Sequence, residues 1–230
     1  MRSLTIALAL ALAGCATTQV YRASGALGFD PALPVQIDDD AIRAAFEARP
    51  QLPAQPRVAL YSFDTDRALA LAARLDAVEG VADTYTIPPF LVTGQRRFAE
   101  ASPYAPPPAA PPVSVESLRL IAARARCDVL VVADHGWRRT SSANGLVALN
   151  VLLVPALFSP FLDLELESYL DLSVIDVRNG FLYGQVSAEE TFERRFNTVW
   201  TVEDDALVDE AWDTLLSEVG VSLEALLSAS

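Results

Sequence analysis

Residues 127–134 read CDVLVVAD, and this stretch decides the fold. Its centre, Val129–Val132, is apolar without alternation, which is typical of a strand that is buried on both faces of a sheet. Such strands occur mostly in parallel sheets that helices cover on both sides, so the stretch predicts an α/β fold. The thiol of Cys127 at its start is predicted to be buried and unreactive.

Two β-α units precede this strand. The sequence predicts strands at 58–63 and 81–91, with one helix after the cluster Asp64-Thr65-Asp66 and another from Ser114 to Arg126. Gly80 is expected to close the first of these helices. The segment Arg57–Asp134 therefore predicts β-α-β-α-β with parallel strands.

A long hairpin is predicted after a polar turn at 141–145. Apolar and polar residues alternate roughly through 165–177, and 181–196 returns as the partner strand. Asn179-Gly180 between them is the pair that a type I′ turn requires. A helix from about Thr201, ending at Gly220, is expected to close the domain. The fold prediction is α/β (α+β), a three-layer-like mixed sheet. The residues of this last helix expected to face inward are Val208, Ala211, Trp212, Leu215, Leu216 and Val219.

The first fourteen residues predict a signal peptide. Arg2 is positive, and the apolar run 4–13 is shorter than the roughly 20 residues that span a membrane. It ends in Leu12-Ala13-Gly14-Cys15, which resembles the lipobox of bacterial lipoproteins. The resemblance implies cleavage between Gly14 and Cys15 and acylation of the Cys15 thiol and, usually, of its new amine. The alternative is an ordinary signal peptide in which Cys15 is incidental.

The same residues predict a location. Ala16 stands where an aspartate would favour the inner membrane, so we expect a lipid anchor in the outer membrane that faces the periplasm, with surface exposure left open. Once Cys15 carries lipid, Cys127 is the only thiol left and no intrachain disulfide is possible. The predicted organisation is a signal peptide (1–14), a lipidated tether with a short helix (15–56) and one periplasmic α/β domain (57–230).

Three segments leave their roles open. The short helix of the tether, near 38–48, carries Ile42, Ala45 and Phe46, which are expected to dock on the core. The proline-rich loop 103–113 is a spacer or a ligand for a proline-recognition domain. The apolar segment 146–162 is a core strand or a surface that touches lipid or a partner.

Charge and composition exclude several functions. The chain has 17 basic residues, all arginine, against 30 acidic ones, and its net charge of −13 opposes unassisted nucleic-acid binding. Without lysine there is no Schiff-base or P-loop lysine. With 52% hydrophobic residues the chain can build a core, which excludes global disorder.

Candidates for catalysis are few. Asp134-His135 lies at the end of the central strand, where α/β proteins often bind ligands, and carries the enzyme hypothesis. Ser141-Ser142 lacks the Gly-x-Ser-x-Gly context of a nucleophile. Glu189, Glu190 and Glu193 are expected to lie on a solvated strand face. One histidine cannot make a zinc site alone, so no metal or cofactor is expected.

Three segments of the chain, one of them in the hairpin, carry a family resemblance. Residues 57–60 (RVAL), 122–132 (AARARCDVLVV) and 172–183 (LSVIDVRNGFLY) resemble periplasmic lipoproteins with a domain similar to the TolB amino-terminal domain, the penicillin-binding-protein activators and the curli secretion lipoprotein. Asp176–Gly180 and 154–158 look most like the rhombotarget lipoproteins, although this chain lacks their C-terminal Gly-Gly signal. The resemblance implies a fold and a compartment, and it transfers no catalytic residue.

Three functions follow as expectations. The first is a non-catalytic binding or scaffolding lipoprotein, anchored by Cys15, with a protein partner in an envelope assembly or secretion machine. The second is a self-assembling, membrane-contacting oligomer that uses 146–162 and strand edges. The third is an envelope enzyme that uses Asp134 and His135. The sequence leaves the oligomeric state open.

Overall fold

A computed structural model describes residues 17–22, 39–93, 113–143, 162–197 and 206–228. The predicted α/β class, with a mixed sheet and a C-terminal helix, is confirmed. The elements are β1 (Thr17–Arg22), α2 (Asp39–Glu47), β2 (Arg57–Ser62), α3 (Ala68–Asp76), β3 (Asp83–Thr86), α4 (Pro89–Thr93), α5 (Val115–Arg124), β4 (Val129–Ala143), β5 (Leu162–Asp176), β6 (Leu182–Asn197) and α6 (Ala206–Ser228).

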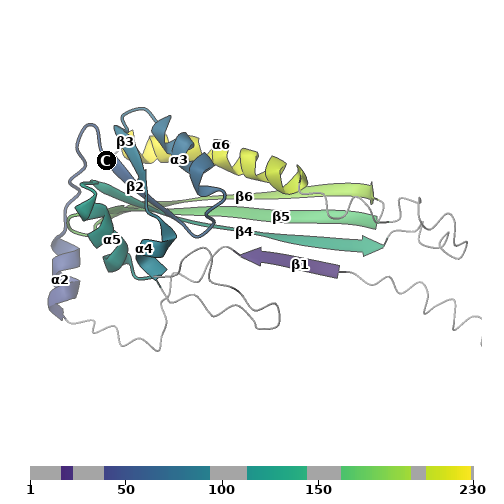
Figure 1. Cartoon of the computed structure of the whole chain (residues 1–230), viewed down its shortest axis with the longest axis horizontal. Helices are drawn as coiled ribbons and strands as arrows, with labels where there is room; N and C mark the ends of the chain where they lie inside the picture. Colours follow the sequence, from purple (N-terminus) through teal and green to yellow (C-terminus); the bar gives the residue numbers. More distant parts are fainter. Residues whose placement is uncertain (1–16, 23–38, 94–112, 144–161, 198–205, 229–230) are drawn as a thin grey trace, which may run out of the picture. The chain divides into compact units, whose positions relative to one another are not determined.

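The strands form one mixed sheet in the order β3-β2-β4-β5-β6, and β1 also pairs with β4 (Figure 1). Strand β2 is parallel to both of its neighbours, with Leu60 opposite Thr86 of β3 and Val131 of β4. This arrangement confirms the predicted parallel β-α-β-α-β segment. Strands β5 and β6 form the predicted hairpin, closed by a bond from the amide of Asp176 to the carbonyl of Phe181.

The chain divides into two compact units. Unit 1 comprises residues 1–21, 136–169 and 189–215, and unit 2 comprises residues 22–135, 170–188 and 216–230. Strands β4, β5 and β6 and helix α6 therefore contribute residues to both units.

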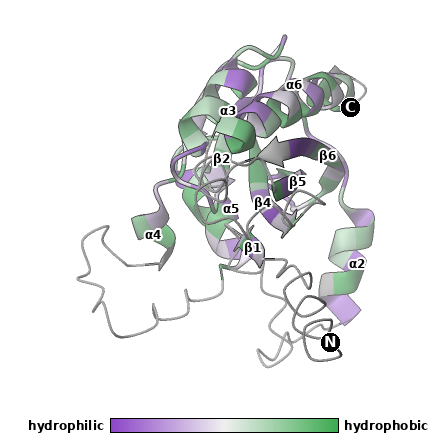
Figure 2. Cartoon of the chain, turned by 90° about the vertical axis from the view of Figure 1, so that its right-hand side faces the viewer, coloured by the Kyte–Doolittle hydropathy of each residue, from purple (hydrophilic) through white to green (hydrophobic). Residues whose placement is uncertain are grey.

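The core of unit 2 explains the unbroken apolar run of the central strand. Successive strand residues point to opposite faces, and both faces are covered. Helices α3 and α5 lie on opposite sides of β2 and β4 (Figure 2). The cluster beneath α5 contains Ala59, Tyr61, Leu118, Ala122, Leu130 and Val132. On the other side, Val58, Leu60, Leu71 and Leu75 are also buried.

The core of unit 1 lies between strand β5 and the first half of α6. Leu164 and Leu166 pack against Leu207, Val208 and Ala211, and Trp137 and Phe192 flank the cluster. The predicted inward stripe of the C-terminal helix is confirmed at five positions, all 4% exposed or less: Val208, Ala211, Trp212, Leu215 and Val219.

Helix α6 does not end at Gly220, as the sequence predicted, but continues to Ser228. Glycine inside a helix costs about 1 kcal/mol relative to alanine. Here a Cβ at position 220 would overlap the guanidinium of Arg74 from α3. The glycine therefore marks a close approach between two helices of unit 2 rather than a helix end.

Two strands also differ in their bounds from prediction. Strand β4 continues to Ala143, so the first three residues of the turn expected at 141–145 belong to the strand. The strand expected at 81–91 covers only Asp83–Thr86, and a helical turn begins at Pro89, where proline is tolerated. Helix α3 starts at Ala68, after the cluster Asp64-Thr65-Asp66 as predicted, and Asp64 caps the turn before it by accepting the backbone amides of Asp66 and Arg67.

The hairpin turn is not type I′. That type needs positive φ at both central residues, whereas only Gly180 has it, at φ +77°, and Asn179 does not. The amide of Gly180 instead donates to the carbonyl of Asp176, which makes a wider turn. In the tether, Ile42 and Phe46 of α2 are 54% and 90% exposed, so the expected docking of this helix on the core is wrong.

Several predictions fall on residues outside the described ranges. They are the signal peptide with Gly14 and Cys15, nearly all of the proline-rich loop 103–113, and the apolar segment 146–162 except for its last residue.

Candidate functional site

The strand β1 begins two residues after the predicted acylation site and lies in the sheet. Its first residue, Thr17, places its hydroxyl 2.5 Å from the hydroxyl of Ser141 on β4. The Ser141 hydroxyl also lies 3.4 Å from the Thr17 carbonyl. Residues 17–22 were expected to belong to the tether, and no sequence signal indicates this pairing. The predicted lipobox is thus followed almost at once by strand β1.

Aromatic stacking fixes the other end of β1. The rings of Tyr21 and Trp137 stack with centroids 5.7 Å apart and an interplanar angle of 19°. The guanidinium of Arg139 lies 5.2 Å from the centre of the Trp137 ring, a cation–π geometry. Because Thr17 meets Ser141 and Tyr21 meets Trp137, β1 runs antiparallel to β4 with a fixed register.

The enzyme candidate His135 is buried at the end of the parallel part of β4. It is 2% exposed, and its Nδ1 lies 3.4 Å from Oδ2 of Asp64, which follows β2 and is 6% exposed. The structure pairs His135 with Asp64, whereas strand alternation directs the neighbouring Asp134 to the opposite face. The sequence identified Asp64 only as a helix-start residue.

Hydrogen bonds stabilise the ionised form of Asp64. Burial would raise the pKa of its carboxyl group, but bonds from His135 and from the amides of Arg67 and Asp66 outweigh burial and lower the pKa. The guanidinium of Arg67 adds a contact at 3.9 Å. This carboxylate therefore joins the end of β2 to β4 and to the start of α3.

A second buried carboxylate organises the hairpin end of unit 2. Asp176 is fully buried. Its Oδ2 accepts hydrogen bonds from the Tyr183 hydroxyl at 2.7 Å and from the backbone amide of Gln51 at 3.2 Å. Its Oδ1 accepts the amides of Arg178 at 2.8 Å and Asn179 at 3.4 Å. Partial burial and the bond to Asp176 raise the pKa of Tyr183 to about 12.

The same hairpin holds the chain that leads into β2. Arg178 donates to the Gln51 carbonyl at 3.0 Å and to Asp128 at 2.6 Å. The side-chain amide of Asn179 donates to the carbonyl of Arg49 at 2.6 Å. Residues 49–51 are therefore bound to the hairpin turn, although the sequence placed them in a tether.

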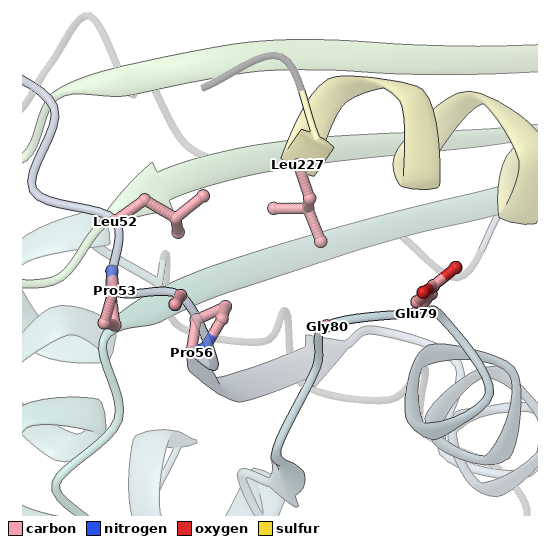
Figure 3. Close-up of a pocket in the computed structure, with 7 residues that line it drawn as sticks. Leu52, Pro53, Pro56, Glu79, Gly80 and Leu227 are labelled. Atoms are coloured by element: carbon pink, nitrogen blue, oxygen red, sulfur yellow. The ribbon is translucent and has the colours of Figure 1, made fainter.

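A shallow apolar pocket of about 250 Å³ lies in unit 2 (Figure 3). It is lined by Leu52, Pro53, Ala54, Pro56, Glu79, Gly80 and Leu227. Glu79 is the only ionisable residue of this lining, and no histidine or cysteine contributes to it. The lining offers apolar contact and no arrangement for acid–base chemistry.

Other candidate residues take structural roles. Cys127 is 5% exposed, and burial raises the pKa of its thiol, as its predicted inertness requires. Glu189 and Glu193 are exposed on β6, whereas Glu190 is half-buried. Within the described ranges, no three His, Cys, Asp or Glu residues come together in a way that could hold a metal ion.

No protein family matches the chain, and no curated protein does. Solved structures to which the chain is similar include the PelC dodecamer from Paraburkholderia phytofirmans and a single-residue variant of it. Each is 12% identical to this chain, with 93% of this chain and 98% of the other covered and a TM-score of 0.35. Among the helices of the described residues, none has the length and apolar character needed to span a membrane.

Proposed function

We propose that this chain is a lipid-anchored binding or scaffolding protein of the bacterial outer membrane, an accessory to an envelope assembly or secretion machine. The observation that carries the proposal is Leu12-Ala13-Gly14-Cys15 directly after an apolar run of signal-peptide length. Acyl chains on Cys15 would hold the domain at the membrane, and several chains give a stable anchor where one does not.

Binding is favoured over catalysis by the surroundings of the candidate residues. His135 and Asp64 are 2% and 6% exposed, so a substrate would reach them only if the strand end opened. The carboxylates that are most thoroughly hydrogen-bonded, Asp64 and Asp176, tie segments of the fold together. The resemblance of the hairpin to periplasmic lipoproteins of the rhombotarget type supports the same compartment.

A second candidate is self-assembly through strand edges. Among the described strands, β6 pairs only with β5, which leaves the other edge of a 16-residue strand without a described neighbour. Such edges recruit further strands, although charged residues oppose it, and β6 presents exposed Glu189, Glu193, Arg194 and Arg195. We therefore place this candidate second.

The test is to crosslink the full-length protein in cells, purify it in detergent, size the particle and identify the proteins that accompany it. The matched control is Cys15→Ser, which keeps the domain and removes the acylated thiol. A discrete envelope protein recovered with the wild type and lost with the control supports the accessory role. A large particle that contains only this chain supports self-assembly instead. Recovery of a lone monomer from both variants would overturn both functions.

A further inference from the structure

The position of β1 determines which part of unit 1 faces the membrane. We infer that the acylated protein sits with the sheet end formed by Thr17, Ser141 and the start of β5 against the lipid headgroups, instead of hanging on a long tether. This inference rests on the proposed anchor at Cys15. The surface that contacts the headgroups is called here the strand-end face, defined by Thr17, Ser142 and Leu162; Ser141, which meets Thr17, is buried.

Covalent geometry limits how far this face can be from the anchor. After cleavage the chain would begin Cys15-Ala16-Thr17, and two extended residues span at most about 7 Å. Acyl chains on Cys15 lie in the hydrocarbon, so its backbone lies at the boundary with the headgroups. The headgroup layer is itself about 5–8 Å thick on each side of the bilayer. Thr17 is therefore held at headgroup depth or just outside it.

The sheet then fixes the level of the neighbouring strands. Thr17 contacts Ser141 through hydroxyls 2.5 Å apart, two residues before β4 ends at Ala143. Strand β5 begins at Leu162, and its hairpin partner β6 ends at Asn197 at the same end (Figure 1). All these strand ends belong to unit 1. Headgroups within reach of Thr17 are thus also within reach of Ser142, the exposed neighbour of Ser141.

The contacts that hold β1 to β4 keep the distance between Cys15 and the strand-end face short. If β1 left the sheet, residues 15–56 would connect the anchor to the domain, and the strand-end face would no longer be held at a fixed distance from Cys15. Against this, Tyr21 stacks on Trp137 while Thr17 meets Ser141, so both ends of β1 are held by β4. Strand β1 advances about 3.3 Å per residue, so the stacked rings lie about 13 Å along the strand from Thr17.

Depth-dependent quenching tests this orientation. In a Cys127→Ser background, a fluorophore is attached through Ser142→Cys on the strand-end face or through Glu189→Cys on β6. Both positions are exposed, and Glu189 lies eight residues before the end of β6, about 25 Å along the strand. The acylated proteins are placed in phosphatidylcholine vesicles that carry a nitroxide on the headgroup, and flotation with the vesicles is measured first.

The inference predicts several-fold stronger quenching at position 142 than at position 189. A twelve-residue Gly-Ser spacer between Ala16 and Thr17, which adds about 20 Å of reach, should remove most of that difference. The same spacer between Gly25 and Ala26, beyond β1, should leave it unchanged. Equal quenching at both positions in protein that floats would overturn the orientation and leave the anchor standing. Failure of the wild type to float would overturn the anchor, and with it the orientation.

Discussion

Thr17 and Ser141 lie hydroxyl to hydroxyl at 2.5 Å, although 124 residues separate them in sequence. Through this contact the residue next but one to the predicted acylation site becomes part of the sheet. The predicted anchor and the fold are therefore not separate parts of the chain, because the first described residues of the predicted mature protein already pair with the central strand.

The first prediction concerns this contact. Ser141→Ala removes one partner of a partly buried hydrogen bond, so the docking of β1 should weaken by about 1 kcal/mol. Hydrogen exchange of the β1 amides in a soluble Cys15→Ser protein measures it, because local opening sets their exchange rate. Ser142→Ala, the exposed neighbour, is the control and should leave these rates unchanged. Equal rates in both variants would show that the hydroxyl contact does not hold β1.

The second prediction concerns the buried carboxylate of Asp176. Each of its two oxygens accepts two hydrogen bonds. Oδ2 accepts the Tyr183 hydroxyl and the backbone amide of Gln51, and Oδ1 accepts the two backbone amides of the turn. Asp176→Asn must turn an NH₂ group toward one of these pairs, so unfolding free energy should fall by about 2–3 kcal/mol. Urea denaturation measures the loss. Asp171→Asn, exposed on the same strand, should change stability by less than about 0.5 kcal/mol, and a comparable loss there would contradict the account.

The third prediction is a pH dependence set by Asp64. Its pKa lies below the ordinary 3.8 in the folded protein, so at neutral pH its full contribution to stability is present. As the pH falls through about 4, the unfolded chain takes up the proton first and the contribution is lost. Asp64→Asn should therefore be less stable than the wild type at pH 7, with the difference shrinking below about pH 4.

Denaturant titrations across this pH range provide the measurement. The control is Asp66→Asn, because that side chain is exposed and two residues away. A stability difference between wild type and Asp64→Asn that stays constant from pH 7 to pH 3 would show that the carboxylate is not stabilised by folding.

The fourth prediction concerns Gly220 and Arg74. Alanine ordinarily stabilises a helix interior by about 1 kcal/mol relative to glycine. At position 220 its methyl group would overlap the Arg74 guanidinium, which is the far end of a flexible side chain and has to move aside, so Gly220→Ala should gain less than this amount in the wild type. In an Arg74→Ala background the same change should stabilise the protein by up to about 1 kcal/mol. A double-mutant cycle by urea unfolding decides this, and an identical effect in both backgrounds would refute the close approach.

Local patterns predicted the parallel core and the hairpin because those signals lie within a few residues. The unbroken run Val129–Val132 indicates a strand covered on both faces, and Asn179-Gly180 between two alternating segments indicates a reversal of the chain. The helix predicted from Ser114 is present as well, and the Ser114 hydroxyl accepts the backbone amide of Ser117 as its cap.

The remaining features depend on contacts between distant residues. Nothing near Thr17 indicates that it pairs with Ser141, and Gly220 resembles a helix end unless Arg74 is known to lie against it. The partnership of Asp64 with His135 likewise arises only when β2 and β4 lie side by side. Periodicity describes a segment and its environment, and it does not identify which distant segment supplies that environment.

The most direct test of the lipid anchor is the mass of the N-terminal peptide of the protein isolated from bacterial membranes. The account predicts a chain that begins at Cys15 and carries acyl groups on its thiol, with none in Cys15→Ser. A mature chain that begins elsewhere, or an unmodified Cys15 thiol, would contradict it.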